Sequence, residues 1–359
     1  MKQKKTQHRA KEHGSESASR AWRGRLALWA GGTVLAAILA MFLVQQARQK
    51  AALAPTNSAP RITSASNLPA TASAPAQARA LSTNSPLQDP NFKIPDDPVE
   101  LMNYGTALLD RGWIDEAITL YSKALKQNPE DEEVHFNLAY AYSKQGRIDE
   151  AIQQYSEALK LFPDYVEAHN NLGNLLTSRE KYAEAMEHFA TALKLMPDNS
   201  STFNRIGRCL AQQGKLREAV TNFAEALRLN PSFSEARTNL FHAHNEWGNR
   251  LTRQQKFDEA IQHYTAALAA VPEHPSGLNN LGRALALEGK TADALTQFGE
   301  AVRLNPSSVE ARCNLGYALL GVGKNEQAAG EFTQALRLKP DHQPAVQGLA
   351  EARKKPSAP

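Results

Sequence analysis

The sequence predicts an all-α protein built as a solenoid of helix–turn–helix repeats. Seven prolines are separated by 34 residues, except for one gap of 41. They are Pro129, Pro163, Pro197, Pro231, Pro272, Pro306 and Pro340. A fixed period of this length indicates stacked helical hairpins, in which each unit contacts only its neighbours. Such a stack offers a long groove to other proteins and brings no built-in chemistry.

Small and aromatic residues recur in register with these prolines. The second helix of each unit carries alanine, an aromatic residue and alanine at i, i+4 and i+7, as in Ala117, Tyr121 and Ala124. This spacing forms one stripe of a helix, and we expect the ring to fill the space between neighbouring hairpins. The first helix carries one small residue per unit, namely Gly105, Ala139, Gly173, Gly207, Gly248, Gly282 and Gly316. Proline then ends the second helix because it lacks an amide hydrogen.

These positions resemble the tetratricopeptide repeat family across residues 98–342. The resemblance implies a right-handed superhelix of antiparallel helix pairs, with a concave face that receives peptides or helices of partner proteins. We divide the array into seven units, namely 98–131, 132–165, 166–199, 200–233, 234–274, 275–308 and 309–342. Residues 343–355 are interpreted as an amphipathic helix that caps the last unit, and 356–359 as a short tail.

The fifth unit is seven residues longer than the others. Its first helix admits two registers, one with Leu240 and Phe241 at the packing positions and one with Trp247 and Gly248. The second is better, because phenylalanine is too large for a position that is otherwise glycine or alanine. Seven residues are close to two helical turns, so we expect one longer helix over 234–252. The extra turns either shape the groove or are an accommodated insertion.

The N-terminal region predicts a membrane anchor. Residues 1–26 are basic, and 27–44 form an uncharged run of eighteen residues, long enough for a transmembrane helix. The positive-inside rule places the N-terminus in the cytoplasm and the repeats across the membrane. A cleaved signal ending near Ala54 is the alternative, which Arg48 and Lys50 disfavour. Residues 45–97, rich in Ala, Pro, Ser and Thr, predict a disordered linker. We therefore expect a single-pass protein of a bacterial inner membrane with a periplasmic array.

Charge and missing motifs exclude several function classes. Residues 98–342 carry 25 basic and 31 acidic residues, which argues against binding nucleic acid. The sequence lacks a phosphate-binding loop, CxxC, HExxH and GxSxG, so we expect no catalytic residue, no cofactor and no metal site. His242 and His244 do not share a helix face. Cys209 and Cys313 lie three repeats apart, and we expect them to fill apolar gaps.

Asparagine recurs in the first helix just before the packing pair, and Arg205 interrupts the series; Asn239 continues it only in the less favoured register. An amide side chain offers a donor and an acceptor, so it can hold a peptide bond. The segment 169–176, HNNLGNLL, resembles the O-GlcNAc transferase family, in which an asparagine ladder holds substrate chains. We therefore predict a partner-binding groove with Asn103, Asn137, Asn171, Asn174, Arg205, Asn280 and Asn314. Asn170, Arg208 and Asn279 belong to the same neighbourhood. The alternative is that these asparagines only bond neighbouring backbone.

These observations favour a non-enzymatic, membrane-anchored scaffold that binds peptides or helices of partner proteins. An alternative is a substrate-presenting accessory subunit of a separate envelope enzyme system, of glycosyltransferase or cytochrome maturation type. A cytoplasmic array would resemble the bacterial lipopolysaccharide assembly regulator, but this chain lacks its C-terminal metal-binding cysteine domain. The residue set that clamps chaperone tails in this family is not found in three successive repeats. The oligomeric state stays open.

Overall fold

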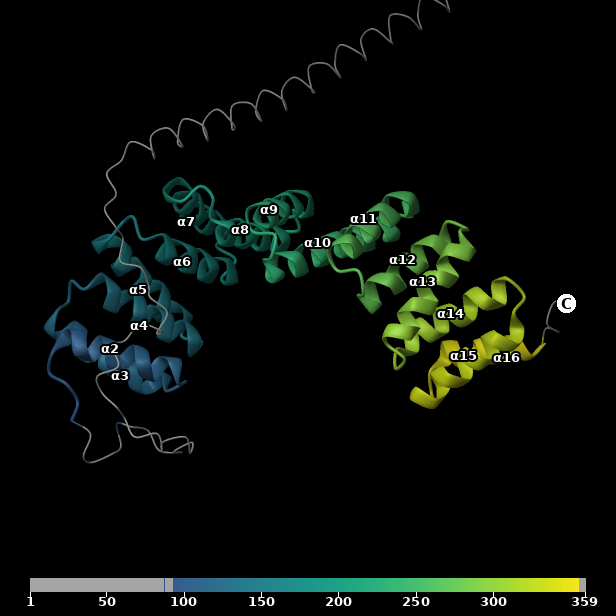
Figure 1. Ribbon diagram of the computed structural model, residues 1–359, viewed down its shortest axis with the longest axis horizontal. Coiled ribbons are helices and arrows are strands. Elements are labelled where there is room, and N and C mark those ends of the chain that lie inside the picture. Colours follow the sequence, from purple (N-terminus) through teal and green to yellow (C-terminus); the bar gives the residue numbers. More distant parts are fainter. Residues whose placement is uncertain (1–86, 88–92, 355–359) are drawn as a thin grey trace, which may run out of the picture. The chain divides into compact units, whose positions relative to one another are not determined.

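A computed structural model describes Leu87 and residues 93–354, and the predicted all-α class is confirmed there. The described residues form seven consecutive helix pairs followed by a single helix, and they form no strand (Figure 1). The pairs are α2 (Pro98–Asp110) with α3 (Ile114–Gln127), α4 (Glu132–Lys144) with α5 (Ile148–Leu161), α6 (Val166–Ser178) with α7 (Tyr182–Leu195), α8 (Ser200–Gln212) with α9 (Leu216–Leu229), α10 (Ser234–Arg253) with α11 (Phe257–Ala270), α12 (Pro275–Leu287) with α13 (Thr291–Leu304), and α14 (Val309–Gly321) with α15 (Asn325–Leu338). The last helix, α16 (Gln343–Lys354), packs on α14 and α15.

The predicted membrane anchor, residues 27–44, and most of the predicted linker lie outside the described residues. None of the helices that the structure does describe has both the length and the apolar character needed to span a bilayer.

Local sequence signals explain where the helices begin. Several first helices have a side-chain cap: the Asp131 carboxylate accepts from the Val134 amide at 3.0 Å, and Asn199 caps α8 in the same way. Second helices instead follow a tight turn whose residue has positive φ. Glycine occupies this turn in five pairs, at Gly112, Gly146, Gly214, Gly289 and Gly323, as the sequence indicates. In the remaining two pairs, Glu180 (φ 59°) and Gln255 (φ 60°) adopt the same conformation, although a side chain disfavours it.

The core of each pair is an aromatic ring held against a small residue. The Phe223 ring of α9 is almost fully buried and lies so close to Gly207 of α8 that a Cβ there would come within 2.6 Å of it. The ring therefore lies chiefly within its own hairpin, against the first helix, rather than only between hairpins as the sequence analysis expects. Phe332 does both, because it also lies against Gly348 of α16.

The two cysteines confirm the expected packing role. Cys209 in α8 and Cys313 in α14 are free, buried thiols. Burial, followed by the charge of Glu310, raises the pKa of the Cys313 thiol, so less of the reactive thiolate is present at neutral pH.

Candidate functional site on the face of the first helices

The first helices of successive pairs contact one another directly. Such contacts join α2 to α4, α6 to α8, α8 to α10, α10 to α12, and α12 to α14. Side chains at equivalent positions of these helices therefore form a row along one face of the array, the face on which the sequence analysis places the asparagines. We call it the first-helix face.

Hydrogen bonds between asparagine side chains cross this face from one unit to the next. In each bond an Nδ2 amide donates to an Oδ1 atom 35 residues earlier in the chain: Asn239 to Asn204 at 2.8 Å, Asn280 to Asn245 at 3.0 Å, and Asn314 to Asn279 at 2.8 Å. We call these three bonds the asparagine rungs. Because an amide left unpaired in a buried place is costly, the rungs tie neighbouring first helices together. Asn280 and Asn314 thus each use one amide N–H inside the protein, while each Oδ1 has further acceptor capacity.

The rung series has an exception at Arg205. The position 35 residues before it is Asn170, which is buried with 4% of its surface exposed. Asn170 Oδ1 accepts instead from the Thr202 hydroxyl at 2.9 Å, so this acceptor is satisfied without a residue at position 205. Arg205 itself is half-buried and donates from Nε to Ser201 Oγ at 3.3 Å.

The other predicted binding residues lie on the same helices but are not gathered into one site. Asn103 is exposed on α2, and Asn137 on α4 and Asn174 on α6 are half-buried. Asn171 donates to the Tyr155 hydroxyl at 3.2 Å, so it supports a core ring of its neighbouring hairpin. Their assignment to partner binding stays a prediction.

The long helix confirms the expected two extra turns and uses both registers. It spans Ser234–Arg253, one residue beyond the predicted end. Gly248 lies against the Tyr264 ring, as the favoured register requires, since a Cβ there would come within 2.6 Å of it. Asn239, in the other register, still forms the rung to the preceding unit, and Asn245 forms the rung to the following one. One helix thus presents a regular repeat surface to each neighbour.

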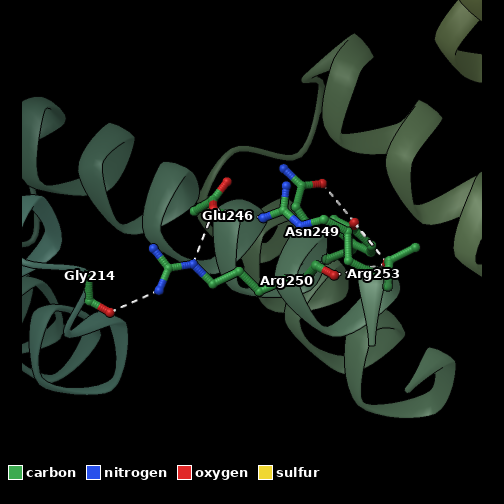
Figure 2. Close-up of polar contacts among 8 residues, drawn as sticks. Gly214, Glu246, Asn249, Arg250 and Arg253 are labelled. Carbon is green, nitrogen blue, oxygen red and sulfur yellow. Dashed lines mark hydrogen bonds and ion pairs between the residues drawn. The ribbon is translucent and has the colours of Figure 1, made fainter. Parts of the chain in front are cut away.

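Polar contacts of its C-terminal half fix the long helix in place (Figure 2). Arg250 donates from Nη1 to the Gly214 carbonyl at 3.0 Å, which links α10 to the turn after α8. Its Nε bonds Glu246 at 3.2 Å, and Arg253 Nη2 reaches the same carboxylate oxygen at 3.3 Å. The Tyr264 hydroxyl donates to Asn249 Oδ1 at 2.8 Å.

A polar cleft of about 470 Å³ opens beside these residues. Its walls come from α10, α11, α12 and the start of α14; they are Asn249, Thr252, Arg253, Tyr264, Pro275, Ser276, Asn279, Asn280, Arg283, Asn305, Ser308 and Glu310. Arg283 lies 3.7 Å from Glu310, which also accepts from Asn279 at 3.2 Å. The cleft therefore combines guanidinium donors, amide groups and one carboxylate, and it includes Asn280 of the predicted site.

Histidine pairs join the two helices of two hairpins. The Nδ1 atoms of His169 and His188 are 2.9 Å apart, and those of His244 and His263 are 3.0 Å apart. Each pair can hold one proton between its facing nitrogens. Burial, followed by the charge of the partner histidine, lowers the pKa of His188 and lowers the pKa of His244 to about 4. His242, in contrast, is exposed.

Two of these features, the rungs and the histidine pairs, have a spacing in the sequence that is not among the predictions above. The rungs join residues that are 35 apart, one more than the repeat period. The donor does not bond its equivalent in the preceding unit; it bonds the residue just before that equivalent, as Asn314 bonds Asn279. The histidine pairs are 19 residues apart, and the same spacing joins Arg312 to Glu331 at 2.6 Å and His135 to Gln154 at 2.7 Å. The cleft has no comparable sequence signal.

A family comparison accounts for nearly all of the described array. A model of the cilia and flagella-associated protein 70 C-terminal domain, a tetratricopeptide repeat domain, matches residues 101–353. The chain belongs to this family of tetratricopeptide repeats. The resemblance drawn from the spacing of prolines and small residues is therefore confirmed at the level of the family, while the likeness to O-GlcNAc transferase stays a prediction. No curated protein matches this tetratricopeptide repeat chain.

The chain is also similar to solved structures, one of which has the same fold. The C-terminal part of a repeat-containing protein from Cytophaga hutchinsonii has a TM-score of 0.58 and 16% identity, covering 69% of this chain and 99% of that one. A tetratricopeptide repeat protein from Parabacteroides merdae has a TM-score of 0.45 and 19% identity, covering 71% and 98%. YrrB, described as a TPR protein with an unusual peptide-binding site, has a TM-score of 0.32 and 24% identity, covering 63% and 96%. The first likeness supports a tetratricopeptide repeat solenoid.

Proposed function

We propose that this chain is a scaffold that binds an extended peptide of a partner protein on the first-helix face. The observation that carries the proposal is the polar cleft between α10, α11, α12 and α14. It is a concave site whose walls carry many converging polar side chains, and it lies on the face that tetratricopeptide repeats present to their partners. The tetratricopeptide repeat fold is typical of non-catalytic interaction proteins, which supports a scaffold rather than an enzyme.

The side chains of the cleft suit a peptide backbone. Asn280 has its Nδ2 bonded to Asn245, so its Oδ1 is oriented and can accept a further N–H group. Arg253 and Arg283 can donate to carbonyl oxygens, and their present contacts to carboxylates, at 3.3 and 3.7 Å, are long and exposed to solvent. A bound strand would thus find donors and acceptors on neighbouring first helices, without recognition of any one side chain.

The wider setting belongs to the same proposal. Each of the seven helix pairs is one tetratricopeptide unit, and α16 caps the last. Residues 27–44 anchor the chain in a bacterial inner membrane, with the array on the periplasmic side, because the basic residues gather before the apolar run. Alkaline phosphatase fused after position 359 tests this topology. Phosphatase activity would support a periplasmic array, and a fusion protein that is expressed but inactive would contradict it. An accessory role in an envelope enzyme system would use the same surface.

The binding test uses a peptide library and a matched pair of variants of the full-length chain. Peptides are selected from a random display library on the wild-type protein, and their affinities are measured by fluorescence anisotropy. Ser276→Trp fills the cleft from its exposed wall, whereas Thr296→Trp adds the same side chain to an exposed position of α13. We expect binding to be lost in the first variant and kept in the second. Selected peptides that bind both variants equally would contradict the cleft as the site.

A further inference from the structure

Arg205 stands where the repeat pattern calls for asparagine, and the fold does not need it there. Equivalent residues Asn239, Asn280 and Asn314 each donate to an asparagine of the preceding unit. The acceptor that a residue at 205 would serve is Asn170, and Thr202 already serves it. Thr202 therefore makes the hydrogen bond to the preceding unit that an asparagine at position 205 would make. The guanidinium of Arg205 is not needed for that bond.

The surroundings of Arg205 compensate its charge only in part. It is half-buried on α8, its Nε donates to Ser201 Oγ at 3.3 Å, and it makes no ion pair within the part of the chain that the structure describes. Arg208 follows at i+3 on the same face of α8, and its own carboxylate contact, to Glu235, is 3.5 Å long. Burial, followed by the charge of Arg208, lowers the pKa of Arg205 against the opposing effect of Glu235, so the array holds two positive charges together at a cost.

Only one of the five guanidinium N–H groups of Arg205 has a hydrogen-bond acceptor among the described residues. A planar guanidinium offers paired donors that match the two oxygens of a carboxylate, and a pair formed in a half-buried place is stronger than one in water. The half-exposed Glu235 contact of Arg208 shows that a carboxylate can reach this part of the face.

We propose that Arg205 and Arg208 form a subsite on the first-helix face for a carboxylate side chain of an acidic peptide partner. The proposal rests on the proposed peptide-binding function and names the partner's chemistry: a segment that carries Asp or Glu at the point where it crosses α8. Repulsion between the two arginines is relieved when the carboxylate binds, so the acidic residue gives both affinity and register.

The test measures binding of two capped peptides to the full-length chain by fluorescence anisotropy at low and moderate salt. One peptide has four Glu-Ser repeats, and the other has four Gln-Ser repeats. Arg205→Asn installs the residue of the equivalent units, while Arg228→Asn removes the same charge from the exposed face of α9 in the same unit. We expect the acidic peptide to bind more tightly than the neutral one, Arg205→Asn to weaken it about tenfold, and Arg228→Asn to leave it unchanged.

Thermal unfolding separates the subsite from a structural role. Arg205→Asn should melt no lower than the wild type, because it removes a half-buried charge that is only partly compensated. The proposal is overturned if the acidic peptide does not bind, if Arg205→Asn binds it normally or unfolds more easily, or if both variants weaken it equally. Tighter binding of a phosphoserine peptide than of the glutamate peptide would also overturn the carboxylate assignment. If Ser276→Trp abolishes binding of the library peptides while Arg205→Asn leaves binding of the acidic peptide unchanged, the proposed function is supported and the carboxylate subsite is contradicted.

Discussion

Acidification should loosen the hairpin of α10 and α11, because His244 and His263 face each other through nitrogens 3.0 Å apart. Protonating both rings would point two N–H groups at one another. Burial, then the charge of His263, lowers the pKa of His244 to about 4, whereas burial lowers the pKa of His263 against the opposing effect of Glu259. The informative substitution is His263→Gln. It recreates the pair of His135 and Gln154, in which an amide oxygen can accept from a charged or neutral ring.

The magnitude follows from the two states of the chain. Histidine in an unfolded chain titrates near its ordinary pKa of about 6.5. Above that pH, His244 is neutral in both states and its pKa shift changes nothing. As pH falls below it, only the unfolded chain takes up the proton, so stability falls until the pH passes about 4. The full shift amounts to about 2 kcal/mol between pH 7 and pH 5. Because His244 is half-exposed, solvent screening reduces this to about 1 kcal/mol.

The assay is urea unfolding of the wild type and His263→Gln at pH 7 and pH 5, followed by fluorescence and circular dichroism. The Trp247 ring stacks on the His263 ring with their centroids 4.0 Å apart, and the Arg217 guanidinium of α9 lies over the Trp247 ring at 5.9 Å. Trp247 therefore contributes a fluorescence signal that is sensitive to this hairpin. The wild type should lose about 1 kcal/mol more than the variant on acidification. His169 and His188 contribute to both proteins and cancel. Equal losses, or a larger loss in the variant, would refute the reasoning.

Three further substitutions test the turn, the core and the rungs. Glu180→Gly should raise the free energy of unfolding by about 0.5 to 1 kcal/mol, because Glu180 holds φ at 59°; an unchanged or lower melting temperature would contradict this. Phe223→Ala should lower it by about 3 to 5 kcal/mol in denaturant unfolding, since the ring is 1% exposed, and a loss below 1 kcal/mol would contradict the packing argument. Asn314→Ala leaves the Asn279 oxygen without its rung donor and should cost about 1 to 2 kcal/mol, whereas the same change at exposed Asn103 should cost little; equal costs would show that the rungs do not stabilise the array.

Repeat spacing is a strong guide to this fold, because the same packing problem is solved in every unit. The glycine and aromatic positions predict the hairpins, and Gly248 opposite Tyr264 even selects the register of the long helix. The left-handed turns at Glu180 and Gln255 escape the sequence, because neither residue marks that conformation and only the position in the repeat requires it. The residue pattern thus predicts the hairpins and the long helix, whereas the two non-glycine left-handed turns are seen only in the structure.

The candidate site is harder to predict, because it depends on contacts between units. Asn280 and Asn314 fit a peptide-holding ladder by residue type, yet each donates one of its two amide N–H groups to an asparagine of the preceding unit. The repeat period of 34 residues aligns equivalent positions of successive units. It therefore does not indicate bonds, such as the rungs, that join residues 35 apart. The role of Arg205 likewise depends on contacts between units. In the sequence Arg205 only interrupts a series of asparagines, whereas in the structure its expected acceptor, Asn170, already accepts a hydrogen bond from Thr202.

The insertion in the fifth unit shows why helix geometry restricts the length of such changes. Seven residues advance a helix by roughly 700°, within about 20° of two full turns, so the faces before and after the insertion coincide. Asn239 and Asn245 can therefore each form a rung, one to the unit before and one to the unit after. An insertion of five residues would rotate the second half by roughly 140° and turn Gly248 away from Tyr264, leaving a phenol ring without its cavity. The added turns keep both interfaces and lengthen only the surface between them, so the array can gain new side chains on the first-helix face without loss of the repeat packing.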